Sequence, residues 1–197
     1  MRSTLLITVA LVGLWLAYAI SPFVSVYRLV GVVAERNVPG LNERVDFPAL
    51  RASLAGQIAT TYLRITGKPV DPESLRDRIA IGVAASLASP LIAELISPEG
   101  LLELLREGRP AATTLSGSAP TLGGLSSDTL GNVWRVYLNS ELGISRFLLN
   151  VPVDKPRHER FKLAFCLRDW TWQLCRIELP EPLLVSLAQE QLKREKQ

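Results

Sequence analysis

Histidine is the side chain that most often acts as a catalytic acid or base, and this chain of 197 residues has only one. His158 lies in the charged segment PRHER at residues 156–160, where its neighbour Glu159 could orient the imidazole. A catalytic base needs such a partner and also a pocket. Loop histidines beside prolines and arginines are usually solvated, so we expect His158 to be a surface residue.

The chain also lacks the short motifs that identify common enzyme classes. G-x-S-x-G, P-loop, H-E-x-x-H and dinucleotide-binding motifs do not occur in it. Two cysteines and one histidine cannot supply the four ligands of an ordinary structural zinc site. The 22 basic residues are interleaved with 19 acidic ones and form no patch that would follow a phosphate backbone. We therefore predict no catalytic residues, no cofactor, no metal and no nucleic-acid partner.

Cys166 and Cys175 would share an oxidising compartment if the domain is exported, so a disulfide has to be considered. With a hairpin turn centred on residues 168–169 or 169–170, both cysteines point to the same face but are offset along the strands by four or two residues. Direct opposition would need a turn centred on residues 170–171, which is poor turn chemistry. We expect two free thiols.

Two aspartates have simple structural explanations. Asp46 precedes a helical pattern, so we favour a helix N-cap over a pocket acid. Asp169 lies between two apolar runs and is expected to be a turn residue.

Aromatic side chains in the last third of the chain form the remaining candidate site. They are Tyr137, Phe161, Phe165, Trp170 and Trp172. Together they could line a ligand pocket inside a curved sheet. Clusters of this kind more often form the core between a sheet and its helices, and we favour the core.

The N-terminal segment predicts the compartment. Residues 5–27 form a run of 23 residues without charge, which is long enough to cross the hydrocarbon layer. Its strongest part is residues 5–20, with Trp15 and Tyr18 toward the end, where aromatic rings favour the headgroup level. Because Arg2 precedes the run, we predict a bilayer anchor at residues 1–21 with a cytoplasmic N-terminus, and an exported domain at residues 22–197.

A cleaved signal peptide is the alternative. Ala17 and Ala19 are small residues at the two positions that a signal peptidase inspects, which would give cleavage after Ala19. The apolar pattern continues without the polar stretch that usually precedes a cut, so we favour a retained single-pass anchor in a bacterial inner membrane. Both interpretations place the domain in the periplasm.

The first part of the exported domain is predicted to form a series of helices. Helical spacing continues to about residue 35 with a kink near Pro22, and further helices begin at Asp46, at residues 71–73 and at residues 97–99. Residues 79–93 are uncharged, and their length fits a core helix better than a membrane-dipping one. Residues 109–131 are rich in glycine, proline and serine and predict a flexible loop.

The last part changes to strands. β-branched and aromatic runs predict four antiparallel strands at residues 133–138, 144–151, 161–167 and 170–179, with a bulge between Leu174 and Ile177. An amphipathic helix at residues 181–193 follows. The fold class is therefore α+β, with an N-terminal transmembrane helix, several helices, a C-terminal four-stranded sheet and a C-terminal helix.

Five short motifs occur in an order that resembles one protein family. They are SPF at residues 21–23, VDFPALR at 45–51, SPEGL at 97–101, WQL at 172–174 and IELP at 177–180. The chain thereby resembles the domain of unknown function 2939 family of uncharacterised bacterial proteins, a resemblance that implies no reaction. One departure is Thr171, because the resemblance implies a glycine immediately before the tryptophan of the final strand. The order of elements also resembles the cystatin-like and nuclear-transport-factor-two-like cone folds, as an analogy of fold alone.

These observations favour a membrane-anchored periplasmic binding or accessory protein of a membrane or envelope complex, without catalytic activity. Its expected partners are the lipid bilayer, through residues 5–20, and an inner-membrane or envelope protein. A periplasmic carrier of a lipid or small apolar ligand is the alternative, with residues 79–96 and the aromatic strands lining its pocket. An enzyme with a pocket acid or base is the third class, and only His158 and Asp46 are candidates for it.

Overall fold

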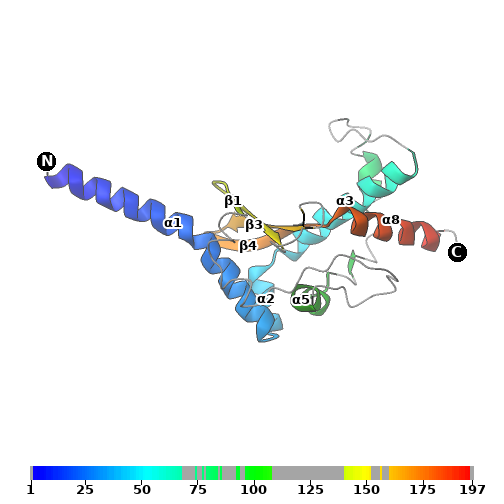
Figure 1. Ribbon diagram of the computed structural model, residues 1–197, viewed down its shortest axis with the longest axis horizontal. Coiled ribbons are helices and arrows are strands. Elements are labelled where there is room, and N and C mark those ends of the chain that lie inside the picture. Colours follow the sequence, from blue (N-terminus) through cyan, green and yellow to red (C-terminus); the bar gives the residue numbers. More distant parts are fainter. Residues whose placement is uncertain are drawn as a thin grey trace.

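The computed structural model describes residues 2–67, 74, 77, 79–83, 85, 92–93, 96–107, 140–151, 156 and 160–195. Its described elements are α1 (Arg2–Ala34), α2 (Val38–Arg44), α3 (Phe47–Ile65), α5 (Pro98–Glu107), β1 (Ser140–Leu142), β2 (Arg146–Val151), β3 (Phe161–Arg168), β4 (Thr171–Glu178) and α8 (Glu181–Glu195). The strands form one open antiparallel sheet in the order β1-β2-β3-β4, with helices before and after it in the chain (Figure 1). The α+β class is therefore confirmed.

Helix α1 has two halves with different surroundings. Every side chain at residues 4–17 is exposed, whereas Val26, Leu29, Val30 and Val33 are buried in the core. These four residues follow a spacing of three and four, so they share one face of the helix. The kink predicted near Pro22 is present: the proline lies inside α1, and the helix bends where it meets the sheet (Figure 1).

The turn after α1 also begins α2, a short helix that we did not predict. Arg36 adopts a left-handed conformation with φ 54°, and the Asn37 N–H donates to the Val32 carbonyl at 3.0 Å. The Asn37 side chain then accepts from the Gly40 N–H at 2.9 Å, and Pro39 occupies the first turn of α2. Asn37, Pro39 and Gly40, which directly follow the helix that we expected to end at about residue 35, therefore start the next helix.

Asp46 caps α3, as we favoured. Its Oδ1 accepts from the Ala49 N–H at 3.0 Å, and its Oδ2 pairs with Arg168 Nε at 3.0 Å. The Asp46 N–H donates to the Leu174 carbonyl at 2.9 Å, and Val45 forms a parallel bridge with Leu174. Asp46 therefore ties the start of α3 to both strands of the last hairpin.

One face of the sheet and the surrounding helices form a continuous hydrophobic core. The sheet contributes Phe147, Leu149, Val151, Phe161, Leu163, Phe165, Trp172, Leu174 and Ile177. These positions alternate along β2, β3 and the first part of β4, as expected for a sheet with one buried face. The fourth predicted helix is confirmed as α5, which supplies four buried leucines and whose first turn is capped by Ser97, the acceptor of the Gly100 N–H at 3.0 Å. The predicted C-terminal helix is confirmed as α8, with Leu183 and Leu187 buried.

Other predicted elements fall partly or wholly outside the described residues. The start of the third helix at residues 71–73, the loop at 109–131 and the strand at 133–138 belong to this group. Strand β1 lies where we predicted a turn. Within the uncharged segment 79–93, Ile92 is buried, but Ile79 and Val83 are 62% and 61% exposed. That part of the segment is not the buried core helix that we expected.

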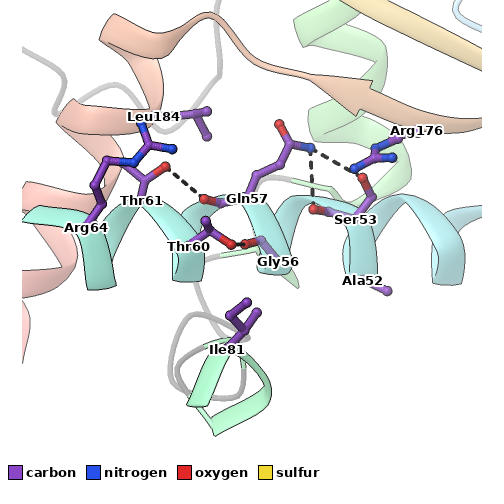
Figure 2. Close-up of a pocket in the computed structure, with 10 residues that line it drawn as sticks. All are labelled: Ala52, Ser53, Gly56, Gln57, Thr60, Thr61, Arg64, Ile81, Arg176 and Leu184. Atoms are coloured by element: carbon purple, nitrogen blue, oxygen red, sulfur yellow. Dashed lines mark hydrogen bonds between the residues drawn. The ribbon is translucent and has the colours of Figure 1, made fainter. Parts of the chain in front are cut away.

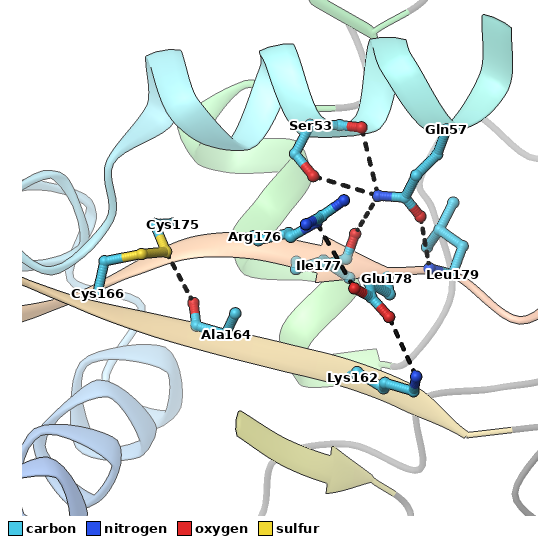
Figure 3. A network of polar contacts seen from close by, with 10 residues as sticks. All are labelled: Ser53, Gln57, Lys162, Ala164, Cys166, Cys175, Arg176, Ile177, Glu178 and Leu179. Carbon is cyan, nitrogen blue, oxygen red and sulfur yellow. Dashed lines mark hydrogen bonds and ion pairs between the residues drawn. A yellow bond between two sulfur atoms is a disulfide. The ribbon is translucent and has the colours of Figure 1, made fainter. Parts of the chain in front are cut away.

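The expectation of two free thiols is wrong, because Cys166 and Cys175 form a disulfide (Figure 3). The β3–β4 turn is centred on residues 169–170, so Cys166 lies opposite Gln173 and is offset from Cys175 by two residues. This is one of the two registers that we considered. The offset alone was our reason for rejecting the disulfide.

A bulge in β4 reduces the distance that this offset leaves between the two cysteines. Phe165 pairs with Leu174 and Ala164 pairs with Arg176, which leaves Cys175 as the additional residue of β4. The bulge lies where the sequence predicted one, between Leu174 and Ile177. It brings the Cα atoms of the two cysteines to 5.8 Å, within the range that a disulfide bridges.

Alkylation can verify the disulfide. The full-length protein isolated without reductant should take up no thiol label, and it should take up two labels after denaturation and reduction, because the chain has two cysteines. Mass spectrometry of the intact chain measures both values. Labelling of two thiols in denatured but unreduced protein would show that the cysteines are free.

The turn of the last hairpin contains an unfavourable residue. Asp169 and Trp170 have φ values of 47° and 64°, which suit a type I′ turn. Such turns prefer Asn-Gly or Asp-Gly, because a Cβ at the second position crowds the backbone. Trp170 is also 92% exposed, so packing within the described residues does not offset this cost.

Replacing Trp170 with glycine should therefore stabilise the fold. Relief of the left-handed conformation is expected to contribute about 1 kcal/mol, which raises the Tm of a chain of this size by about 2–4 °C. Thermal unfolding of the full-length protein in detergent measures the change. Trp170→Ala is the matched control and should gain much less, because alanine keeps the Cβ. A lower Tm for Trp170→Gly would show that the indole contributes to the stability of the fold.

Candidate functional site

The junction between α1 and the sheet lies where α1 changes from its exposed half to its buried half. We define it by Tyr18, Ser21 and Phe23 of α1 with Phe147 of β2 and Trp172 of β4. The Phe23 and Phe147 rings meet edge to face with centroids 4.9 Å apart, and the Tyr18 and Trp172 rings lie 6.3 Å apart. Aromatic pairs in these arrangements add to the stability gained by burial alone.

Hydrogen bonds join the same residues. Trp172 Nε1 donates to Ser21 Oγ at 2.8 Å, and Ser21 Oγ donates to the Tyr18 carbonyl at 2.8 Å. In a regular helix the N–H four residues later would bind that carbonyl, but residue 22 is a proline and has no N–H. Ser21 therefore satisfies the backbone group that Pro22 leaves unpaired. The Tyr18 hydroxyl donates to the carbonyl of Ile144, in the β1–β2 turn.

The junction fixes the exposed half of α1 relative to the domain. The helix runs without interruption from Arg2 to Ala34, so no flexible linker separates the two parts. The SPF motif at residues 21–23 thus has a physical role, in which serine and phenylalanine bind the sheet and proline bends the helix. Whatever surrounds the exposed half of α1 also determines how the domain is oriented.

A cavity of about 420 Å³ lies beside α3 and is one candidate for a ligand site (Figure 2). It is lined by Ala52, Ser53, Gly56, Gln57, Thr60, Thr61, Arg64, Ile81, Arg176 and Leu184. Six of these ten residues have polar side chains, while apolar atoms make up the larger share of the exposed lining. The lining is therefore mixed, and the partners of its polar groups decide whether they are available to a ligand.

The polar groups around the cavity already have partners in the protein. Thr60 and Thr61 hydroxyls donate to carbonyls one turn earlier on α3, at 2.7 and 2.9 Å. Arg64 pairs with Glu181 at 3.2 Å, and the guanidinium group of Arg176 lies 3.6 Å from Glu178. These groups stabilise α3 and its contacts, and none of the lining residues is an acid, a histidine or a cysteine.

Gln57 in the cavity wall has a structural role that we did not predict. Its Nε2 donates to the Ile177 carbonyl at 2.8 Å, and its Oε1 accepts from the Leu179 N–H at 3.1 Å (Figure 3). Gln57 thereby replaces a neighbouring strand at this part of the β4 edge. Its position three residues after Leu54 on the buried face of α3 is the signal that could have identified it.

The predicted aromatic site is only partly assembled in the described structure. Phe161, Phe165 and Trp172 belong to the hydrophobic core. Trp170 lies at the tip of the last hairpin, where its exposure separates it from them. Tyr137 lies outside the described residues, as does His158. In the described part of the chain, no group of three or more histidine, cysteine, aspartate or glutamate side chains could hold a metal ion.

A double-mutant cycle can test the junction hydrogen bond. Ser21→Ala removes the acceptor of the Trp172 N–H and the donor to the Tyr18 carbonyl, while Trp172→Phe removes the indole N–H. We expect a coupling free energy of about 1 kcal/mol between the two substitutions, measured by unfolding of the full-length protein in detergent. Ser25→Ala on the same helix is the control and should not couple to Trp172→Phe. Additive effects of Ser21→Ala and Trp172→Phe would contradict the hydrogen bond.

Comparisons with known proteins identify a family but no relative of known function. Searches of curated proteins and of solved structures found no match, and the analogy with cone folds stays a prediction. The model of a family described as "Protein of unknown function (DUF2939)" matches residues 11–104. The matched region contains the junction residues of α1, all of α2 and α3, and most of α5. Over this region the chain is therefore similar to the DUF2939 family, which agrees with the resemblance that its motifs indicated.

Proposed function

We propose that this protein is a single-pass, membrane-anchored binding or accessory subunit without catalytic activity, whose domain lies on the periplasmic side of a bacterial inner membrane. The main support for the proposal is that the two halves of α1 have different surroundings. Its first half exposes apolar side chains on all sides, and its second half is part of the core of the domain. By length and composition, α1 is able to cross a membrane. One helix then serves as both anchor and core element.

The disulfide and the N-terminal charge support the orientation. A disulfide between Cys166 and Cys175 persists in an oxidising compartment such as the periplasm and is rare in the cytosol. Arg2 precedes the apolar half of α1, and the positive-inside preference favours a cytoplasmic location for it. These two observations are independent, and both favour an exported domain.

The junction supports a retained anchor over a cleaved signal peptide. Cleavage after Ala19 would remove Tyr18 and with it the ring contact to Trp172 and the carbonyl bound by Ser21. It would also leave the new terminus directly beside the core residues of α1. A signal peptide is normally independent of the mature fold, whereas this segment is continuous with it.

The proposed role in binding follows from what the described side chains do. Arg64 and Arg176, which line the cavity beside α3, form ion pairs with Glu181 and Glu178, and Asp46 is a helix cap held by Arg168. A catalytic site would instead bring a base or nucleophile to a cavity. A domain held rigidly at a membrane surface is suited to binding another component of that membrane.

Fractionation tests the anchor and its orientation. The full-length chain, produced in a bacterial host, should remain in carbonate-washed membranes with an intact N-terminus by mass spectrometry. Protease added to spheroplasts should digest the domain, because it faces the periplasm. A soluble chain that starts at Ile20 would overturn the anchor, and a domain protected until the inner membrane is lysed would overturn the orientation.

Cross-linking in intact cells tests the accessory role. The full-length protein should cross-link to an inner-membrane or envelope protein. A chain with residues 1–20 replaced by an unrelated membrane span should retain that cross-link if the partner binds the domain, and should lose it if the partner binds the exposed half of α1. Recovery of only uncross-linked monomer from both proteins would contradict an accessory role.

A further inference from the structure

Two large apolar side chains are exposed at one end of the sheet. Trp170 in the β3–β4 turn is 92% exposed, and Ile144 in the β1–β2 turn is 90% exposed. Both turns lie at the same end, since the Leu167 N–H beside the second turn donates to the Ser145 carbonyl in the first at 3.0 Å. We call this end of the sheet, defined by Ile144 and Trp170, the hairpin tips.

The fold does not explain these residues. Neither side chain is buried by the described part of the protein, so neither contributes hydrophobic stabilisation there. Trp170 also occupies a left-handed position at which glycine would be less strained. A costly residue at an exposed turn suggests an interaction with something outside the domain.

The hairpin tips adjoin the exposed half of α1. The Tyr18 hydroxyl binds the carbonyl of Ile144, and Ser21 binds Trp172, two residues after Trp170. Figure 1 shows this end of the sheet beside the bend of α1. The tips therefore lie at the level along the helix where its free apolar segment ends.

The length of that segment sets the distance from the tips to the membrane. Residues 4–17, which precede the junction, span about 21 Å at a rise of about 1.5 Å per residue, whereas the hydrocarbon layer is about 30 Å thick. From Tyr18 onward the helix is bound to the sheet and has no free length. A bilayer crossed by α1 must consequently extend to the junction, and so to the hairpin tips.

We propose that the hairpin tips are a second membrane contact, with Trp170 and Ile144 in the interfacial layer of the bilayer that α1 spans. This inference rests on the anchor in the proposed function. Tryptophan favours the headgroup level, which suits Trp170, and Trp15 and Tyr18 on α1 are also near this surface. The charged residues beside the tips are Arg146 and Arg168 with Glu141 and Asp169, so net charge gives no strong attraction and apolar contact dominates.

Two attachment points would hold the domain in one orientation. A single helix permits the domain to tilt toward or away from the bilayer, whereas a second contact at the tips restricts that tilt. The bend at Pro22 and the bonds of Ser21 then keep the sheet end against the lipid surface. The same end of the domain would then always point away from the bilayer.

Quenching of tryptophan fluorescence by brominated lipids tests this contact in the full-length protein. The protein is reconstituted in phosphatidylethanolamine and phosphatidylglycerol vesicles with bromine near the carbonyl end or near the methyl end of the acyl chains. The signal of Trp170 is the difference between the native chain and Trp170→Phe, and that of Trp15 is the difference from Trp15→Phe. We expect about a twofold loss of the Trp170 signal with the shallow bromines and little loss with the deep ones.

The Trp15 signal separates failure of this inference from failure of the anchor. Quenching of Trp15 without quenching of Trp170 would overturn the tip contact and leave the anchor intact. Absence of quenching at both would overturn the anchor as well. A Trp170 shielded from aqueous iodide but not quenched by lipid bromine would overturn the lipid contact in favour of a protein partner.

A second variant makes the test independent of Trp170. Ile144→Trp in the Trp170→Phe background moves the reporter to the other hairpin tip, at a side chain that is almost fully exposed. Its signal should be quenched by the shallow bromines to a similar extent. Moving the reporter instead to the far end of the sheet, as Lys162→Trp in the same background, is the control and should show no quenching. Equal quenching at both positions, or at neither, would overturn a contact specific to the tips.

Discussion

The structure depends on satisfying the free edge of β4. This strand ends the sheet order β1-β2-β3-β4, so its outer backbone groups have no neighbouring strand. Unpaired edges are costly when buried and prone to association when exposed. Here the Leu174 carbonyl accepts from the Asp46 N–H, while Gln57 binds the Ile177 carbonyl and the Leu179 N–H. The need of these edge backbone groups for hydrogen-bond partners therefore determines where α3 begins and which of its faces meets the sheet.

The same strand determines how α1 is held. Trp172 binds Ser21 of α1, and Gln173 Nε2 donates to the Glu43 carbonyl of α2 at 3.0 Å. The WQL and IELP motifs thus belong to the strand that contacts every one of the first three helices. The bulge at Cys175 contributes to this role, since it shifts the alternation so that the carbonyls of residues 174 and 177 both face the open edge.

Local patterns predicted most elements because short-range physics fixes them. The Asp46 cap, the start of α5 at Ser97 and the strands around residues 161–178 all follow from side-chain spacing and capping chemistry. The errors arose where one residue carries signals for two elements, or where contacts between distant segments determine the local geometry. Asn37 both ends and starts a helix, and the Cys166–Cys175 disulfide required the displacement that a bulge adds to a register offset.

The sequence by itself determined the fold class and an apolar N-terminal run of 23 uncharged residues, because composition and periodicity depend on the chain alone. Only the tertiary structure decided which part of this run packs in the domain and which part stays exposed. Hydropathy cannot distinguish apolar surface that faces lipid from apolar surface that faces protein. The sheet binds α1 from Tyr18 onward, and the core buries Val26, Leu29, Val30 and Val33 on one face of the helix, which leaves only the residues before the junction free to contact a membrane. Where α1 meets Trp172 therefore decides how close the domain lies to the bilayer.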